Sequence, residues 1–385
     1  MRTALVHDWL TGMRGGEKVL DAICELYPDA PLYCLVHIPG SVSPRIERRR
    51  IVTSAVQRLP GSHRFYRQYL PLFPAAVELF DLDGYDLVIS TSHCAAKAVV
   101  ARGGAVHVDY CHSPMRYAWD QFNEYFGVPQ VGRVRHQVLR PVMAALARWD
   151  RATADRVHRF VANSRYVAGR IRRYYNRGST VVYPPVDTAF YRPPDDHGRP
   201  RSRFLIVSAL VPYKRLDVAI DACRQVRAPL TIVGTGPERA RLERAAGSDV
   251  EFLGWRSDDE IRTLYSQSTA VLLPGIEDFG MVPVEAQACG CPVVALGEGG
   301  AAESVVDGET GVLVHDRSVE AFADGLTRVM ALSLDESELR RNALRFSKDA
   351  FLEGFQAAVT GAARENKQAA RRTPPPPQAA RENQL

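Results

Sequence analysis

Two glutamates that lie close together in the chain are the residues best suited to chemistry. Glu277 and Glu285 are separated by seven residues, among which Gly280 lets the backbone approach a ligand closely. The amides of Gly280, Met281 and Val282 fall at the start of an expected helix, where unpaired N–H groups favour phosphate. Because carboxylates accept hydrogen bonds from sugar hydroxyls, an anion site beside two acids fits a sugar nucleotide.

The neighbouring elements place this segment at a sheet edge. Ala270–Leu273 and the run from Val293 are typical of buried parallel strands. Pro283 suits the first turn of a helix, and Gly290 suits its end. The order strand, loop, helix, strand puts the loop where open α/β sheets bind ligands. For Glu285 alone, a helix-dipole role in the first turn is the competing explanation.

The run E-D-F-G-M-V-P-V-E-A resembles the signature of retaining glycosyltransferases of family 4. The resemblance covers the chain up to about residue 365 and implies an α/β GT-B fold, in which two Rossmann-like domains with parallel sheets face a cleft. It implies that Glu277 holds the hydroxyls of the donor sugar and Glu285 the ribose. It also places Phe279 and the amides of residues 280–282 at the donor diphosphate.

The first half begins with a similar arrangement. A strand is expected at Thr3–His7, a loop at Asp8–Met13, and a helix from near Glu17. The sequence lacks the complete G-x-G-x-x-G of dinucleotide-binding proteins. The resemblance implies that Gly15 and Gly16 face the cleft near the donor phosphate and the acceptor, whereas a plain turn is the alternative.

His112 follows an expected strand at Val106–Tyr110, and Pro114 fixes a loop directly after it. A lone histidine there is more often structural than catalytic. The resemblance implies that His112 lies beside the donor sugar and hydrogen-bonds it. The run YCHSPMRYAWD also resembles a mannosyltransferase-like branch, so mannose from GDP-mannose is the first expectation.

The first strand of the second half leads into SALVPYKRLD, where the family usually has an arginine and a lysine on the donor diphosphate. This chain has Lys214 but Ala209 at the arginine position. Arg215 is the candidate to compensate, although neighbouring side chains point in different directions. Because a charged hydrogen bond contributes about 1.5–3 kcal/mol, the departure bears on activity.

Two further loops are expected to border the nucleotide. Gly234 lies in a glycine-rich turn after the strand Leu230–Val233, and Leu253 lies in a segment whose backbone meets the base. Backbone contacts do not separate a GDP-sugar from a UDP-sugar, so both remain candidate donors. Gly299–Glu303 follows another strand and is expected to line the same pocket.

The remaining elements divide the chain. We expect domains at residues 1–195 and 196–345, a helix at 346–365 that crosses back to the first domain, and a disordered tail at 366–385. Further strands are expected at Leu32–Val36, Leu87–Ser90, Phe160–Asn163, Val181–Asp187, Phe204–Ser208, Glu251–Leu253 and Gly311–Val314. Helices are expected at Arg133–Arg159 and after Ser164, which is a good N-cap.

The composition is that of a globular protein and argues against a chain that spans a membrane. The 385 residues are 46% hydrophobic and 24% charged, with no apolar run near the ~20 residues that span a membrane. The N-terminus has no secretory pattern. Seven cysteines without C-x-x-C spacing favour reduced thiols, a cytoplasmic location and no metal site.

The net charge of +5 has two explanations, a GC-rich genome or affinity for phosphates and anionic membranes. Leu59–Pro74 mixes basic and aromatic residues, which suits either a helix in the membrane interface or a surface helix with a buried aromatic face. The basic residues are not clustered with an RNA-binding motif, so nucleic acid is not an expected partner.

These observations predict a metal-independent retaining glycosyltransferase without a cofactor, in which His112, Glu277 and Lys214 are catalytic. It would move a hexose from a nucleotide-sugar donor to a saccharide or lipid-linked acceptor. A cytoplasmic protein with peripheral contact at the inner face of the cell membrane is expected. A nucleotide-sugar binding protein without transferase activity is the alternative, because of Ala209. A basic structural protein is the second.

Overall fold

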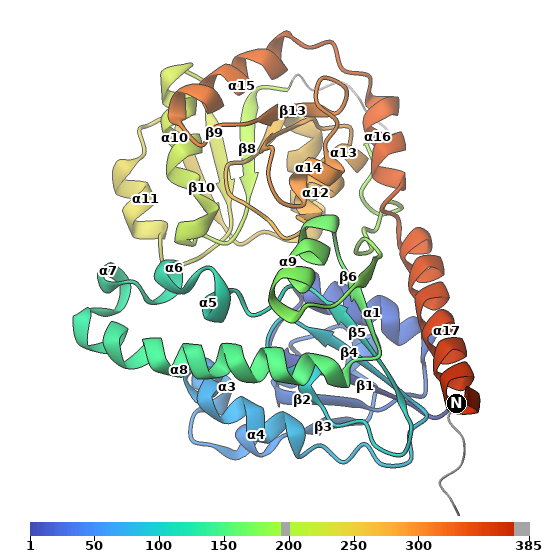
Figure 1. Cartoon of the computed structure of the whole chain (residues 1–385). Helices are drawn as coiled ribbons and strands as arrows, with labels where there is room; N and C mark the ends of the chain where they lie inside the picture. Colours follow the sequence, from blue (N-terminus) through green and yellow to red (C-terminus); the bar gives the residue numbers. More distant parts are fainter. Residues whose placement is uncertain (194–200, 373–385) are drawn as a thin grey trace, which may run out of the picture.

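The computed structural model describes residues 1–193 and 201–372, with side chains to residue 368. Its strands form two separate sheets, which lie one above the other in Figure 1. The first sheet contains β1 (Thr3–Leu10), β2 (Leu32–His37), β3 (Ile51–Thr53), β4 (Leu87–Ser92), β5 (Val106–Cys111), β6 (Arg159–Ala162) and β7 (Ser179–Val181). The second contains β8 (Arg203–Val207), β9 (Leu230–Val233), β10 (Val250–Gly254), β11 (Ser268–Leu273), β12 (Val293–Leu296) and β13 (Gly311–Val314).

Every neighbouring pair of strands is parallel. The strand order is β3-β2-β1-β4-β5-β6-β7 in one sheet and β10-β9-β8-β11-β12-β13 in the other. In both, the order reverses beside the first strand of the sheet, which is where such folds bind ligands at the carboxyl ends of the strands. The predicted α/β class with two parallel sheets is confirmed.

Helices connect the strands and cover the sheets. Those of the first half are α1 (Gly15–Leu26), α2 (Pro44–Glu47), α3 (Ser62–Phe65), α4 (Phe73–Glu78), α5 (Arg116–Trp119), α6 (Phe122–Phe126), α7 (Val128–Val131), α8 (Arg133–Ala152) and α9 (Arg165–Tyr175). Those of the second half are α10 (Leu216–Gln225), α11 (Arg239–Ala245), α12 (Asp258–Gln267), α13 (Met281–Ala288), α14 (Ala301–Ser304), α15 (Val319–Ala331), α16 (Glu336–Leu344) and α17 (Lys348–Arg372). The Ser164 hydroxyl accepts a hydrogen bond from the Val167 amide and so caps α9 as expected.

Strand β1 is longer than predicted, because Asp8 belongs to the strand and not to the following loop. Its carboxylate is fully buried and accepts hydrogen bonds from four consecutive backbone amides, His93 to Ala96, at 2.6–2.8 Å. These bonds compensate the carboxylate for the water that it loses. An acidic residue was therefore no sign that the strand had ended.

The segment Leu59–Pro74 is not the single helix that was predicted. It consists of α3, a 3₁₀ helix at Tyr66–Leu72 that contains Pro71, and the start of α4. Proline has no amide hydrogen to donate, which interrupts the α-helical pattern. Tyr66 and Phe73 are buried against Trp9, whereas Phe65 is exposed.

The predicted strand Val181–Asp187 is also largely wrong. Strand β7 ends at Val181, and the two prolines that follow cannot donate to a sheet. Beyond them, Val186 forms only an isolated bridge with Ser347. The interdomain boundary expected near residue 195 lies among residues 194–200, outside the described part of the chain.

The last helix returns to the first sheet. After α16 on the second sheet, α17 runs down beside α1 and the first sheet in Figure 1. Phe351 and Phe355 lie 5.7 and 6.0 Å from the ring of Tyr110 on β5 and belong to the same apolar core. The helix continues through Arg372, so residues 366–372 are helical and are not the disordered segment predicted. Residues 373–385 lie outside the described part.

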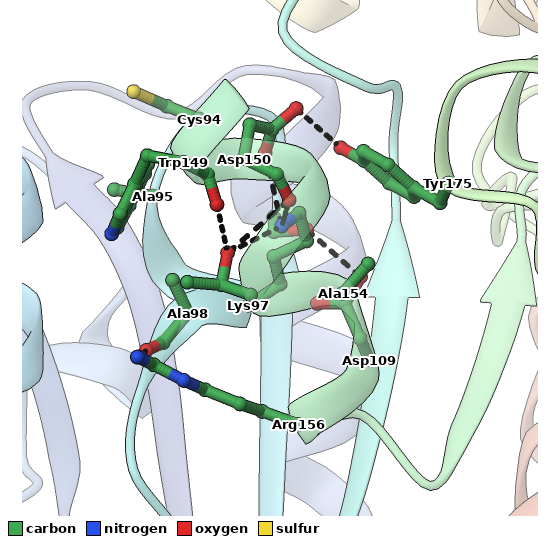
Figure 2. Close-up of polar contacts among 12 residues, drawn as sticks. Cys94, Ala95, Lys97, Ala98, Asp109, Trp149, Asp150, Ala154, Arg156 and Tyr175 are labelled. Carbon is green, nitrogen blue, oxygen red and sulfur yellow. Dashed lines mark hydrogen bonds and ion pairs between the residues drawn. The ribbon is translucent and has the colours of Figure 1, made fainter. Parts of the chain in front are cut away.

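A buried polar network in the first half of the molecule is centred on Lys97 and Asp150 (Figure 2). The ammonium of Lys97 lies 3.0 Å from Oδ1 of Asp150, and both side chains are buried. The hydroxyl of Tyr175 and the indole N–H of Trp119 donate to Oδ2 of Asp150 at 2.9 and 2.8 Å. Lys97 lies on the 3₁₀ turn Ala96–Ala98 that follows β4 and also donates to Thr153 at 3.1 Å, so this network joins that turn to α8 and α9.

All seven cysteines are buried free thiols. Among the described residues, no helix is long and apolar enough to cross a membrane. The same part of the chain contains no cluster of histidine, cysteine or acidic side chains that could hold a metal ion.

Candidate functional site

The loop between β11 and α13 is built as the sequence predicted. Gly280 is the N-cap of α13 and has φ of +80°, a conformation that favours glycine. A second loop supports it, because the Gly300 amide donates to the Glu277 carbonyl at 2.8 Å. A Cβ at Gly300 would lie 2.1 Å from Cα of Phe279, so only glycine fits there. The N-terminal amides of α13 therefore have a fixed position.

Lys214 and Glu277 come together at this loop. Lys214 lies at the end of a 3₁₀ turn, Pro212–Lys214, and its ammonium contacts Oε1 of Glu277 directly. Burial and the positive charge of Arg116 lower the pKa of Lys214. The negative charge of Asp278 opposes this shift in the pKa of Lys214, and the Glu277 carboxylate lies directly against the amino group. A phosphate would compete with Glu277 for this cation.

Glu285 is buried on α13, but one turn later than predicted, because the helix begins at Met281. The hydroxyl of Tyr265 donates to its Oε2 at 3.1 Å. The ammonium of Lys18, from α1 in the first half, lies 3.3 Å from its Oε1. A helix-dipole role no longer explains Glu285, since it is beyond the first turn; it is a buried acceptor that joins the two halves.

Gly15, Gly16 and His112 also meet at the same place. A Cβ on Gly16 would lie 3.6 Å from Nε2 of His112, and one on Gly15 would lie 3.4 Å from Sδ of Met281 on α13. Nε2 of His112 is buried and has no hydrogen-bond partner among the described residues. Burial, followed by the nearby His93, keeps the pKa of His112 well below its usual value. The imidazole is therefore neutral and has a nitrogen available to a ligand.

The side chains of the other predicted donor residues in this loop pack in an apolar cluster, which leaves their backbone groups to contact a ligand. The side chain of Phe279 is buried between Tyr183 and Phe346, so it positions the loop and leaves only its backbone to a ligand. Met281 and Val282 are partly buried and belong to the same apolar cluster. Their amides remain the groups that suit a phosphate.

Gly234, Leu253 and Arg215 make contacts of their own within the second half of the molecule. The Gly234 amide donates to the carbonyl of Gly254 at 2.7 Å, which joins the ends of β9 and β10, and Leu253 is partly buried on β10. Arg215 has a left-handed backbone and pairs with Asp217 at 3.2 Å. Its side chain is 47% exposed.

Comparison with known proteins identifies the family. Residues 13–190 match the model described as Glycosyltransferase Family 4, and residues 189–346 match the one described as Glycosyl transferases group 1. Together these consecutive matches cover most of the chain. The chain belongs to glycosyltransferase family 4. The mannosyltransferase-like branch is not specifically indicated by these matches.

Curated relatives agree with this family-4 assignment. The chain is 30% identical over 293 residues to D-inositol 3-phosphate glycosyltransferases of Mycobacterium bovis and Mycobacterium tuberculosis. That alignment covers 65% of this chain and about 60% of the length of those relatives.

Solved structures agree with the fold. HepE from Anabaena in complex with UDP-glucose gives a TM-score of 0.64 at 21% identity, covering 96% of this family-4 chain and 100% of HepE. The apo form of the lipopolysaccharide outer core galactosyltransferase WaaB gives 0.65 at 17%, covering 94% and 99%. The predicted GT-B fold is therefore confirmed.

Sequence reasoning missed several polar residues of this family-4 site. Nε of Arg116 donates to Oδ2 of Asp278 at 2.7 Å, and Lys18 reaches Glu285 from α1. Nδ1 of His93 lies 3.1 Å from Oδ2 of Asp8. Arg116 lies four residues after His112, and Asp278 follows Glu277 directly, so proximity to the motifs was the available signal. Ser90–His93 follows a strand and was a candidate loop at the sheet edge, but its pairing with Asp8, like that of Lys18 with Glu285, is shown only by the folded structure.

Proposed function

We propose that this chain is a retaining, metal-independent glycosyltransferase. It would transfer a hexose from a nucleotide diphosphate sugar to an acceptor hydroxyl. The observation that carries the proposal is the meeting of Lys214, Glu277, His112 and the N-terminus of α13 at the edges of the two sheets. Family membership and the matching GT-B fold support it.

In this mechanism the diphosphate takes the place of Glu277 at Lys214. The ammonium and the α13 amides stabilise the negative charge that develops on the leaving group. Freed from Lys214, the Glu277 carboxylate accepts hydrogen bonds from the sugar hydroxyls. The neutral His112 contributes Nε2 as a further hydrogen-bonding group to the sugar.

Glu285 would bind the ribose hydroxyls. Its oxygens are hydrogen-bonded by Lys18 and Tyr265. Each carboxylate oxygen has two lone pairs, so Oε1 can accept from a ribose hydroxyl while Lys18 stays close. The ribose contact would then depend on both halves of the molecule.

The reaction itself breaks the bond between the anomeric carbon and a diphosphate oxygen. The acceptor oxygen forms its bond to that carbon on the same face, and its proton passes to the departing phosphate oxygen. The side chains around the loop act through charge and position, and no carboxylate is assigned as a covalent nucleophile. This route retains the configuration at the anomeric carbon.

The donor is the finer part of the proposal. The run YCHSPMRYAWD supports mannose from GDP-mannose, whereas the UDP-glucose bound to HepE supports a UDP-sugar as the competing donor. The acceptor would be a saccharide or a lipid-linked sugar. A nucleotide-sugar binding protein without turnover is the second candidate, and Ala209 is the observation that favours it.

Two measurements test these proposals. Calorimetry with GDP and UDP establishes whether a nucleotide binds, and a transfer assay with a panel of sugar acceptors establishes turnover. Binding without transfer to any acceptor would favour the second candidate. Binding of neither nucleotide would contradict both.

Variants at the two glutamates then test the assigned roles. Glu285→Ala should weaken nucleotide binding, and Glu277→Ala should lower turnover more than nucleotide affinity. Glu309→Ala is the matched control, because this glutamate is exposed in the same half of the chain. Unchanged nucleotide affinity in Glu285→Ala, or normal transfer by Glu277→Ala, would remove the corresponding role.

Peripheral membrane association at the inner face of the cell membrane remains part of the proposal. Its support is the exposure of Phe65 and Leu72 on the predicted segment, beside the exposed Arg64 and Arg67. Apolar and basic side chains together suit an anionic surface. Co-sedimentation with anionic but not neutral vesicles, reduced in Phe65→Ser, is the expected result. Equal sedimentation with both kinds of vesicle would contradict it.

A further inference from the structure

The donor site has a cation missing from the loop that follows β8. Ala209 is exposed at the end of this strand, where related proteins were expected to have an arginine. The Arg215 guanidinium is paired with Asp217 and is 47% exposed. Lys214 alone would then face a diphosphate that carries at least two negative charges.

Arg116 reaches the same site from the first half of the molecule. It begins α5, in the loop that leads from His112, and its Nε and Nη2 both bind Oδ2 of Asp278. Asp278 follows Glu277 in the donor loop, so two adjacent carboxylates hold two cations that come from different halves of the molecule. The Arg116 guanidinium and the Lys214 ammonium lie over the same Tyr213 ring, at 5.7 and 5.2 Å from its centroid.

The electrostatics indicate that these cations are close neighbours. After burial, the charge of Arg116 is the next cause that lowers the pKa of Lys214, and it also acts on His112. Two cations this close repel each other unless anions lie between them. The carboxylates of Glu277 and Asp278 provide the negative charge between the two cations. A bound diphosphate would add further negative charge there.

Arg116 has the geometry to bind a phosphate without losing Asp278. Nε and Nη2 are used by the carboxylate, and the neighbouring Tyr213 hydroxyl also interacts with the guanidinium, so Asp278 does not take up all of its N–H groups. The side chain is 22% exposed, so a ligand can reach it. The planar fork of a guanidinium lets one edge hold Asp278 while the remaining N–H groups face a phosphate oxygen.

We propose that Arg116 is the second cation of the donor diphosphate site and replaces, from the first half of the molecule, the arginine absent at position 209. The inference rests on the proposed function, since it requires a nucleotide diphosphate in this site. It adds that the diphosphate is held by cations from both halves of the molecule. A competing interpretation is that Arg116 and Asp278 only tie the two halves together.

Calorimetry with GDP and UDP, and with GMP and UMP as probes that lack the second phosphate, separates these interpretations. Arg116→Gln should weaken diphosphate binding by about 10- to 100-fold, the effect of one charged hydrogen bond. Monophosphate affinity should change by less than about threefold. Arg224→Gln, which removes an exposed arginine paired with Asp221 on α10, is the matched control and should leave both affinities unchanged.

Rescue provides the sharper test. In the Arg116→Gln background, Ala209→Arg should restore a large part of the diphosphate affinity, because it supplies a guanidinium from the second half of the molecule. Arg116→Lys keeps a positive charge beside Asp278 but loses the fork. It should therefore retain the wild-type melting temperature with weaker diphosphate binding, which keeps the proposal testable if the glutamine variant does not fold.

Three results would overturn the proposal. Unchanged diphosphate affinity in both Arg116 variants would do so, as would an equal loss of mono- and diphosphate binding together with a lower melting temperature. Wild-type protein that binds no nucleotide would overturn the proposed function as well. If the wild type binds a diphosphate and the Arg116 variants bind it equally well, only the present inference fails.

Discussion

Replacement of Lys97 by methionine is the perturbation whose energetic effect follows most directly from the structure. Lys97 and Asp150 are 1% and 0% exposed, and the ammonium lies 3.0 Å from Oδ1 of the carboxylate. Oδ1 has no hydrogen bond of its own among the described residues and depends on this charge (Figure 2). In Lys97→Met, a desolvated carboxylate would keep only the neutral donors Trp119 and Tyr175, both on Oδ2.

The expected magnitude is large. Removing one partner of a buried ion pair costs about 3–5 kcal/mol, because the remaining charge is uncompensated. For a unit of roughly 150–250 residues, each kcal/mol lowers the melting temperature by about 2–4 °C. The variant should therefore melt about 6–20 °C below the wild type.

Urea denaturation followed by tryptophan fluorescence, together with thermal melting, measures this effect. Arg224→Ala is the control, since Arg224 pairs with Asp221 at 2.5 Å on an exposed helix surface. Its loss should cost less than about 1 kcal/mol. The double variant Lys97→Met/Asp150→Asn should recover part of the stability, because no charge remains buried. If Lys97→Met stays within about 1 kcal/mol of wild type, or if the double variant loses the sum of the single effects, the reasoning is wrong.

Three other predictions follow from the structure. Burial raises the pKa of Asp109 to about 7, above its ordinary value of about 3.9, so stability falls as the pH rises between these values. Asp109→Asn should gain stability relative to wild type from pH 5 to 8 in a denaturation series, and a difference that does not vary with pH would contradict this. Gly300→Ala should lower nucleotide affinity at least about tenfold in calorimetry, because its Cβ would overlap Phe279, whereas Gly169→Ala has open space and should bind normally. Transfer should survive a chelator, since the positive charge comes from Lys214 and helix amides; loss with rescue by magnesium or manganese would refute it.

Much of the fold could be predicted because buried parallel strands are short apolar runs. Leu230–Val233 and Gly311–Val314 have the predicted bounds. Two strand boundaries were predicted wrongly because the polarity of the residues was an unreliable guide to where a strand ends. Asp8 is polar but lies inside β1, since four amides bind it, and Val181–Asp187 is apolar but contains two prolines.

For the candidate site, the sequence located the loops more readily than the pairings. Lys214 beside Glu277, and Gly16 beside His112, agree with the predicted arrangement in space, although their roles stay predictions. The pairing of Lys18 with Glu285 joins residues 267 positions apart. No local pattern encodes such a contact, because it depends on how the two sheets face each other.

The return of α17 to the first sheet has a consequence for the order of synthesis. The apolar surface around Tyr110 and Val108 is covered by Phe355 and its neighbours, which are made some 245 residues after Tyr110. On the ribosome, the first half therefore waits with an open hydrophobic face while the second half is translated and folds. The finished N-terminal core is the last part of the molecule to close, and a chain interrupted before residue 348 would leave that face exposed to aggregation.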